Sequence, residues 1–207
     1  MGNYSIVVLD FETTGLSPYY GDRSIEIGAV LIQNNQIVDR FQSLMNPGMR
    51  ISSFIEDYTG ISNKMLRDAP AIDVVMNQFS TFIAENHLVA HNAGFDSRFL
   101  DAELNRMNKK RKQEFACSML VSRRLYPEAP NHKLETLVRI KKLKTTGIFH
   151  RALADAEMTG HLWINMINDL KTNYNFKTVP FELMQRLSKV PKAKAHAFLN
   201  RLAEQQR

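Results

Sequence analysis

The chain has 207 residues, of which 44% are hydrophobic and 23% charged, and its formal net charge is +6. This length allows one domain with a substantial core, and the composition excludes a disordered or fibrous protein. The single cysteine excludes an intrachain disulfide, no apolar run approaches the roughly 18 residues of a membrane span, and the start lacks a signal-peptide pattern, so we expect a cytoplasmic protein.

The beginning of the sequence predicts three strands. Residues 5–11 form a short apolar run rich in β-branched side chains, which is typical of a strand buried on both faces. Residues 25–33 and 36–45 predict two more strands, and the Asn34-Asn35 pair between them is a hairpin signal. We therefore expect an antiparallel meander.

Helices and shorter strands follow this meander. Apolar residues recur at spacings of three and four from Ile72 to Ile83, which indicates an amphipathic helix. The later predicted elements, in chain order, are a strand at 88–91, a helix at 95–107, a strand at 115–118, a helix around 134–143 and a long helix at 152–170. This order predicts an α/β fold with a mixed sheet flanked by helices.

The end of the chain differs from the rest in charge. Residues 1–170 hold 19 Lys and Arg against 19 Asp and Glu, whereas residues 171–207 hold eight against two. We expect residues 1–170 to be the domain and residues 171–207 a basic extension with helices near 181–187 and 193–202. The extension suits a polyanion such as nucleic acid, and it equally suits a solvated end that keeps the protein soluble. On the first reading, the tail holds DNA through Lys189, Lys192, Lys194 and Arg201.

Two acids end the first predicted strand. Asp10 and Glu12 are two residues apart, so the period of a strand places both side chains on one face. Neighbouring carboxylates repel each other and are costly to bury unless a cation binds them. Hard cations such as Mg²⁺ prefer oxygen ligands, so the pair is a candidate metal site. The alternative is a solvated strand end.

A second cluster follows the predicted strand at 88–91. Asp96 lies where the next helix begins, and the helix dipole favours an acid at that place with or without a function. The functional interpretation makes Asp96 a third metal ligand, with His91, Asn92 and Phe95 lining a nucleotide site. The alternative interpretation makes His91 and Asn92 turn residues and Phe95 a core residue.

His150 and Asp155 form a third cluster. At about 100° per residue, five helical steps separate their side chains by roughly 140°, so they cannot converge on one regular helix. They converge if His150 lies in the loop before the helix, after Gly147, and Asp155 projects from the second turn. The alternative is a surface histidine and an exposed acid. We further predict that His150 is mobile. If the site hydrolyses a substrate, the histidine should approach the attacking water only when substrate and metal are present.

Taken together, the three clusters supply four carboxylates and one histidine. A pair of divalent ions needs several bridging carboxylates, and such a pair stabilises both the attacking and the leaving oxygen in phosphodiester cleavage. A histidine is suited to accept the proton of the attacking water near neutral pH.

At these residues the sequence resembles the DEDD exonuclease superfamily, in its histidine-bearing (DEDDh) branch, which includes the proofreading ε subunit of bacterial DNA polymerase III. The resemblance is carried by three motifs in the family's order, namely Leu9-Asp10-Phe11-Glu12-Thr13-Thr14-Gly15-Leu16, His91-Asn92-Ala93-Gly94-Phe95-Asp96 and His150-Arg151-Ala152-Leu153-Ala154-Asp155-Ala156.

The resemblance implies a ribonuclease-H-like sheet with helices on both faces and a 3′→5′ exonuclease that releases nucleoside 5′-monophosphates. It implies two Mg²⁺ or Mn²⁺ ions held by Asp10, Glu12, Asp96 and Asp155, with His150 as general base. It also implies that Thr13 and Leu16 hold the terminal nucleotide, beside His91, Asn92 and Phe95.

Two features depart from the ε subunit. Some ε subunits carry a histidine where this chain has Thr59, and the tail lacks the long linker expected before a polymerase-docking segment. A stand-alone repair nuclease therefore fits as well as a proofreading subunit that binds a polymerase catalytic subunit.

The substrate prediction is frayed or single-stranded 3′ ends of DNA, with RNA as the alternative, as in oligoribonuclease or ribonuclease T. Two other classes of function compete with the exonuclease: a non-catalytic nucleic-acid-binding or polymerase-accessory module, and a metal phosphatase acting on small molecules. The presence of all five catalytic residue types together argues against the non-catalytic module, whereas a phosphatase would hydrolyse a nitrophenyl phosphate but not oligonucleotides.

Overall fold

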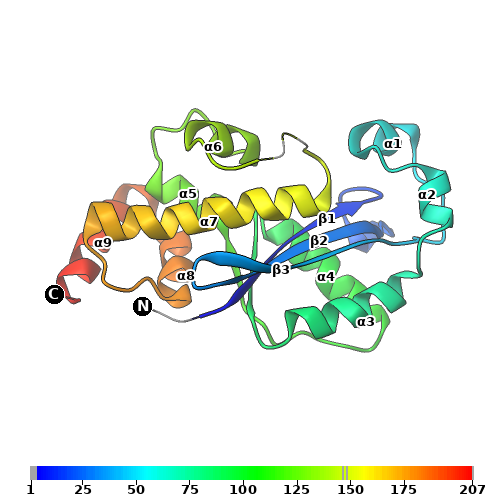
Figure 1. Cartoon of the computed structure of the whole chain (residues 1–207), viewed down its shortest axis with the longest axis horizontal. Coiled ribbons are helices and arrows are strands. Elements are labelled where there is room, and N and C mark those ends of the chain that lie inside the picture. The colour runs from blue at the N-terminus through cyan, green and yellow to red at the C-terminus, as the bar shows by residue number, and fades with distance from the viewer. Residues whose placement is uncertain (1–3, 146, 148, 207) are drawn as a thin grey trace.

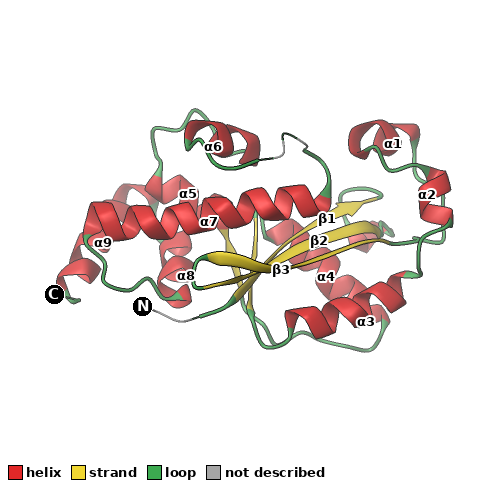
Figure 2. Ribbon diagram, in the orientation of Figure 1, coloured by secondary structure: helices red, strands yellow, loops and turns green. Residues whose placement is uncertain are grey.

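The computed structural model describes residues 4–145, 147 and 149–206. In this part of the chain a five-stranded sheet with the order β3-β2-β1-β4-β5 lies at the centre, and helices cover both of its faces (Figure 2). The predicted fold class, a mixed sheet flanked by helices, is confirmed. The strands are β1 (Ile6–Thr13), β2 (Ser24–Gln33), β3 (Gln36–Leu44), β4 (His87–Ala90) and β5 (Phe115–Cys117).

The helices lie between and after these strands, as Figure 1 shows. They are α1 (Ser53–Thr59), α2 (Asn63–Arg67), α3 (Ile72–Ile83), α4 (Gly94–Arg106), α5 (Ser118–Leu125), α6 (Leu134–Ile140), α7 (Ala152–Tyr174), α8 (Phe181–Lys189) and α9 (Ala195–Glu204), with short 3-10 turns η1 (Pro18–Tyr20) and η2 (Lys192–Lys194). In the described part of the chain, no helix is long and apolar enough to cross a bilayer.

The predicted meander is confirmed. β1 pairs antiparallel with β2, and β2 pairs antiparallel with β3, through a turn at Asn34 and Asn35. Both asparagines have positive φ, 52° and 60°, which asparagine tolerates better than most residues and which a tight hairpin turn requires. β4 and β5 continue the sheet in parallel with β1.

Alternation along β1 divides the core into two halves. Ile6 and Val8 pack with the buried face of α7, whereas Val7 and Leu9 pack with α3 and α4 on the other face. Because side chains alternate, Asp10 and Glu12 continue the face of Ile6 and Val8, towards α7. The carboxylates therefore lie between the sheet and the long helix.

The C-terminal residues share this core. α7 continues to Tyr174, beyond the predicted end at 170, and α9 begins at Ala195, after η2 instead of at 193. Phe181 of α8 stacks on His87 at 4.1 Å between ring centroids, and Gln185 donates to the carbonyl oxygen of Phe115 on β5 at 3.0 Å. α8 thus lies against the edge of the sheet. The division of the chain at residue 170 stays a prediction, and residues 1–3, 146, 148 and 207 lie outside the described part.

Candidate active site

Strand register places the first two carboxylates beside specific partners on β2. Asp10 lies opposite Gly28, and Glu12 lies opposite Glu26, so each pair shares a face of the sheet. The register shifts between Glu12 and Thr13, where β1 nears its end. Such bulges reorient side chains at the end of a strand, and here the bulge lies directly beside Glu12.

Gly28 allows α7 to approach the sheet at this point. A Cβ on Gly28 would lie 2.0 Å from the main-chain nitrogen of Leu153 and 2.2 Å from the carbonyl carbon of Ala152. Only a residue without a side chain therefore fits beneath the first turn of α7. This close contact brings Asp155 over the strand that carries Asp10. Asp155 lies in the first turn of α7, not in the predicted second turn.

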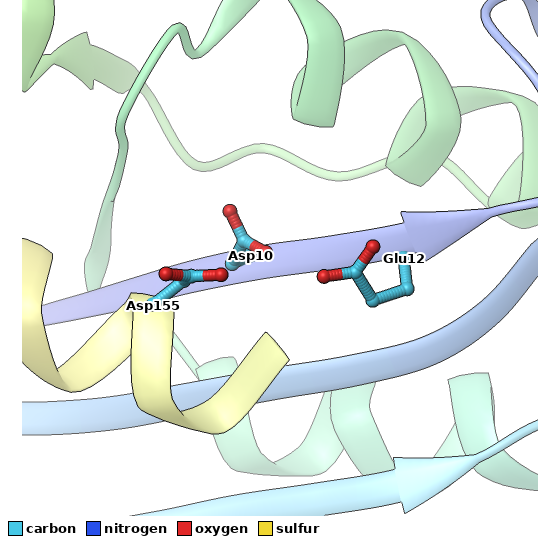
Figure 3. Close-up of side chains that lie close together, drawn as sticks. All are labelled: Asp10, Glu12 and Asp155. Carbon is cyan, nitrogen blue, oxygen red and sulfur yellow. The ribbon is translucent and has the colours of Figure 1, made fainter. Parts of the chain in front are cut away.

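Three carboxylates meet at this place. Oxygen atoms of Asp10, Glu12 and Asp155 all lie within 4.8 Å of one another. Figure 3 shows the three carboxylate groups gathered between the end of β1 and the start of α7. Carboxylates at such distances can share a cation, so the donor set fits a hard divalent ion.

Asp96 lies next to this group but outside it. The residue is 2% exposed, and its Oδ1 accepts a hydrogen bond of 3.2 Å from the main-chain nitrogen of Phe11, the residue between Asp10 and Glu12. The side chain lines the same cavity as the other three acids. Asp96 is thus tied to β1 and borders the site.

His150 lies in the loop before α7, as predicted. Its backbone is left-handed, with φ of 60°, and its main-chain N–H donates to Oδ2 of Asp155 at 2.9 Å. The imidazole lies against the ring of Tyr58 on α1, with 4.0 Å between ring centroids. The histidine and the last carboxylate are therefore joined through the backbone, while the ring remains exposed at the cleft. The predicted mobility of the ring stays a prediction.

Burial and mutual repulsion oppose ionisation of the carboxylates. Burial raises the pKa of Glu12 to about 8, of Asp96 to about 7 and of Asp155 to about 6, and it raises the pKa of Asp10 well above its usual range. Part of the increase in the pKa of Asp10 and Glu12 comes from the charges of neighbouring carboxylates, first of all Asp96 for Asp10 and Asp155 for Glu12. A bound divalent cation would remove this penalty, which supports a metal site.

A fifth buried carboxylate lies beneath the cluster and is neutralised differently. Glu26 is fully buried and accepts hydrogen bonds from Nη2 (2.8 Å) and Nε (3.2 Å) of Arg151 and from the main-chain nitrogen of Ala152 (3.1 Å). These bonds hold Arg151 and Ala152, where α7 begins, against β2. This pair was not predicted from the sequence, although an acid within an apolar strand, two residues before Gly28, could have suggested it.

The predicted nucleotide-binding residues lie along one cleft beside the carboxylates. A lobe of about 460 Å³ is lined by Thr13, Leu16, Asn92 and Phe95, and by His91, which also lines a second lobe of about 610 Å³. Leu16 is 81% exposed, whereas the Thr13 hydroxyl donates to the carbonyl oxygen of Gly15 at 2.6 Å and so stabilises its own turn. Asn92 is exposed, with φ of 70°, and Phe95 packs on Phe99.

His91 is committed to protein contacts. Nε2 lies 2.9 Å from the carbonyl oxygen of His132 and Nδ1 lies 2.8 Å from the hydroxyl of Ser118. Burial lowers the pKa of His91 to about 4, so the ring is neutral, and Nε2 donates to the carbonyl while Nδ1 accepts from Ser118. His91 can therefore shape the cleft but has no free nitrogen for a substrate.

Aromatic side chains of α1 complete the cleft and were not predicted. Phe54 and Tyr58 stack on each other with 5.9 Å between ring centroids and an interplanar angle of 11°. They are 70% and 50% exposed and line the lobe with Leu16. α1 is too short for its apolar residues to form a recognisable helical repeat, so the sequence did not predict this helix.

Comparisons with known proteins match this chain to exonucleases. Residues 7–162 match the sequence model of a family described as exonuclease. The PolC-type DNA polymerase III of Caldanaerobacter subterraneus subsp. tengcongensis is 41% identical over 165 residues, which cover 80% of this chain and 12% of that protein. The PolC-type enzyme of Bacillus subtilis is 39% identical over 165 residues, which cover 79% and 11%. The chain thus spans 11–12% of the length of these relatives.

Solved structures show the same fold. Exonuclease X, in complex with 5′ overhanging duplex DNA, matches with a TM-score of 0.71 and 28% identity over 88% of this chain and 99% of that one. The nuclease domain of 3'hExo, a DEDDh family member bound to rAMP, matches with a TM-score of 0.69 and 20% identity over 81% and 93% of the two chains. The predicted ribonuclease-H-like fold and exonuclease class are confirmed. With the family match extending over most of its length, and the acids of the motifs gathered in one cleft, this chain belongs to the exonuclease family.

Proposed function

We propose that this chain hydrolyses DNA from the 3′ end and releases nucleoside 5′-monophosphates. The observation that carries the proposal is the meeting of Asp10, Glu12 and Asp155 within 4.8 Å, in a cleft that His150 also lines. The 39–41% identity to PolC-type DNA polymerases supports DNA as the substrate.

The donor set proposed for the ions is Asp10, Glu12, Asp96 and Asp155, and the ions are Mg²⁺ or Mn²⁺. Members of the family generally use divalent ions, and buried carboxylates with raised pKa values fit such ions. When bound, a pair of divalent ions stabilises the charge that develops on the attacking and leaving oxygens of the phosphodiester.

His150 is proposed as the general base. Its exposed imidazole can accept a proton from the attacking water at a ring nitrogen, while its backbone N–H stays bonded to Asp155. The ring contact with Tyr58 limits where the imidazole can lie. The base is thereby kept beside the carboxylates.

The lobe next to α1 is proposed to hold the terminal nucleotide. Leu16, Phe54 and Tyr58 offer apolar and aromatic surface to the base, since aromatic rings stack on any base without sequence preference. Thr13, Asn92 and Phe95 line the same lobe, and His91 shapes its wall.

The biological role follows from the same proposal. Identity to PolC-type polymerases favours proofreading in DNA replication, beside a polymerase catalytic subunit, over a stand-alone repair nuclease. Co-purification with that subunit would support the proofreading role, whereas a free nuclease that degrades DNA alone would favour repair.

The test uses the full chain with Mg²⁺ or Mn²⁺ on 5′-labelled single-stranded DNA, matched RNA and circular single-stranded DNA. We expect a ladder of shortened DNA, mononucleotide products, and no cleavage of the circle. His150→Ala should lower kcat by a factor on the order of 10² to 10⁴ with little change in KM. Equal or faster cleavage of RNA would overturn the substrate assignment, and cleavage of the circle would overturn the exonuclease mode.

A further inference from the structure

The cleft extends from the carboxylates and Tyr58 towards α5 and the loop before α6. This second lobe, of about 610 Å³, is bordered by Arg123 of α5 and by Asn131, His132 and Lys133 before α6. The bond between Nε2 of His91 and the carbonyl oxygen of His132 holds that loop against the cleft. Asp10 and Asp155 line the end of the lobe at the carboxylates, whereas its outer end holds two cations, Arg123 and Lys133, and one acid, Glu135. The lobe is therefore basic at its outer end.

The C-terminal segment contacts α5, the helix whose Arg123 borders the lobe. Nε of Arg124 donates to the carbonyl oxygen of Val190 at 2.9 Å, which fastens the end of α8 to α5. Lys192 follows two residues later and begins the exposed turn η2. Burial lowers the pKa of His132, and the charges of Lys192 and then Arg123 lower it further, so both cations act on a side chain that lines the lobe.

The two lobes differ in what they can hold. The lobe beside α1 contains Glu12 and Asp96 and is lined by apolar and aromatic groups, which suits one terminal nucleotide. The strand that remains after cleavage carries a phosphate at every further residue. Cations are needed along its path, because phosphate contacts supply most of the affinity in sequence-independent binding. The basic lobe supplies them.

We propose that the C-terminal segment is part of the substrate-binding surface, with Lys192, Arg123 and Lys133 binding phosphates on the 5′ side of the scissile bond. This inference rests on the proposed exonuclease function. It assigns a role to a segment that lies outside residues 7–162, the part that matches the family. Of the four tail cations considered from the sequence, Lys192 follows two residues after Val190, whose carbonyl oxygen binds Arg124 of α5.

The test compares Lys192→Ala with Lys110→Ala, a variant that loses the same charge elsewhere. Lys110 lies five residues before β5, which runs parallel to β1, so it belongs to the opposite end of the sheet from the carboxylates. Both lysines are exposed, so neither change threatens the fold. KM and kcat are measured on a dinucleotide and on a longer single-stranded oligonucleotide over a range of salt concentrations.

We expect Lys192→Ala to raise KM for the longer oligonucleotide by about fivefold at low salt, the effect of losing one exposed ion pair. The kcat for this substrate, and both KM and kcat for the dinucleotide, should stay unchanged. The slope of log KM against log salt should fall by about 0.7. Lys110→Ala should match the wild type. Equal behaviour of the two variants would overturn the inference while leaving the exonuclease intact, whereas a wild type that releases no mononucleotides would overturn the proposed function itself.

Discussion

Two groups of acids in this molecule differ in whether arginines bind them. Glu26 and Glu103 are 0% and 1% exposed, and arginines bind them: Arg151 binds Glu26, and Arg23 and Arg106 bind Glu103. The four candidate metal ligands, Asp10, Glu12, Asp96 and Asp155, form no ion pair with a lysine or arginine in the described part of the chain.

The difference separates acids that stabilise the fold from acids that we propose bind a divalent cation. A buried carboxylate that is paired and hydrogen-bonded stabilises the position of its partners, as Glu26 does for Arg151 and Ala152. A buried carboxylate without such a partner destabilises the fold when it ionises. Because none of the four acids forms an ion pair with an arginine in the described part of the chain, their carboxylates can accept a cation.

The largest effect is expected when a carboxylate of the unpaired group is removed. Asp10→Asn keeps the shape but removes a charge, so activity should fall on the order of 10³-fold or more. The metal-free variant should also melt at a higher temperature than the metal-free wild type, since one source of repulsion is gone. Unfolding and oligonucleotide cleavage are measured on the same samples. Unchanged cleavage would remove Asp10 from the site.

A change that moves the groups apart should come next. Gly28→Ala places a methyl group 2.0 Å from the backbone of α7, so the first turn must shift away from the sheet. A displacement of about 1 Å can cost about 100-fold in rate. We expect a loss of kcat of that order together with weaker stabilisation by Mg²⁺. Ala29→Gly, in the same strand but on the other face, removes a methyl group instead of adding one and should leave the position of Asp155 intact.

The paired group should respond more weakly in activity. Glu26→Gln weakens the hold on Arg151 and Ala152 and should lower stability by about 2 kcal/mol and activity by about tenfold or more, as for a residue that orients a ligand through another group. Glu103→Gln should lower stability by a similar amount but leave kcat near the wild-type value, because Glu103 binds Arg23 and Arg106, and none of the three lines either lobe of the cleft. Equal losses of kcat in both variants would contradict the distinction.

The smallest effect is in the pH dependence of stability without metal. The folded pKa of Glu12, about 8, lies above its ordinary value of 4.5, so stability from this group is full below pH 4.5 and lost as the pH rises through 8. His91, with a lowered pKa of about 4, acts in the opposite direction between that value and its ordinary 6.5.

Comparison with Glu12→Gln isolates the acid. From about pH 5 to pH 8, the metal-free wild type should lose at least about 3 °C in Tm relative to this variant, which corresponds to about 1 kcal/mol for a chain of this length. Added Mg²⁺ should remove the difference for the wild type. If Tm changed with pH in the same way for the wild type and for Glu12→Gln without metal, ionisation of Glu12 would not destabilise the fold.

Local patterns were sufficient for much of the fold. The meander, the strand and helix at 88–107 and the long helix from Ala152 were predicted, because hydrophobic periodicity reports which side of an element is buried. The short helices α1, α2 and α5 were not predicted, since five to eight residues show too few turns for a periodic signal.

The candidate site divides in the same way. The two-residue repeat of side chains along a strand was enough to place Asp10 and Glu12 on one face. On one helix the side chains of His150 and Asp155 would point about 140° apart, so the histidine had to lie in a loop. What the sequence did not reveal is that Tyr58 lies against His150, or that Glu26 binds Arg151 from 125 positions away.

The sequence by itself therefore determined the identity of the acids, the elements that carry them and the faces from which they project. The tertiary structure decided which of them meet, and the reason lies in two long-range fits. β2 aligns Gly28 and Glu26 opposite Asp10 and Glu12, and α7 can dock on the sheet only where that glycine leaves room and that glutamate binds its first turn. No local pattern contains the distance between two segments, because that distance depends on the packing of everything between them.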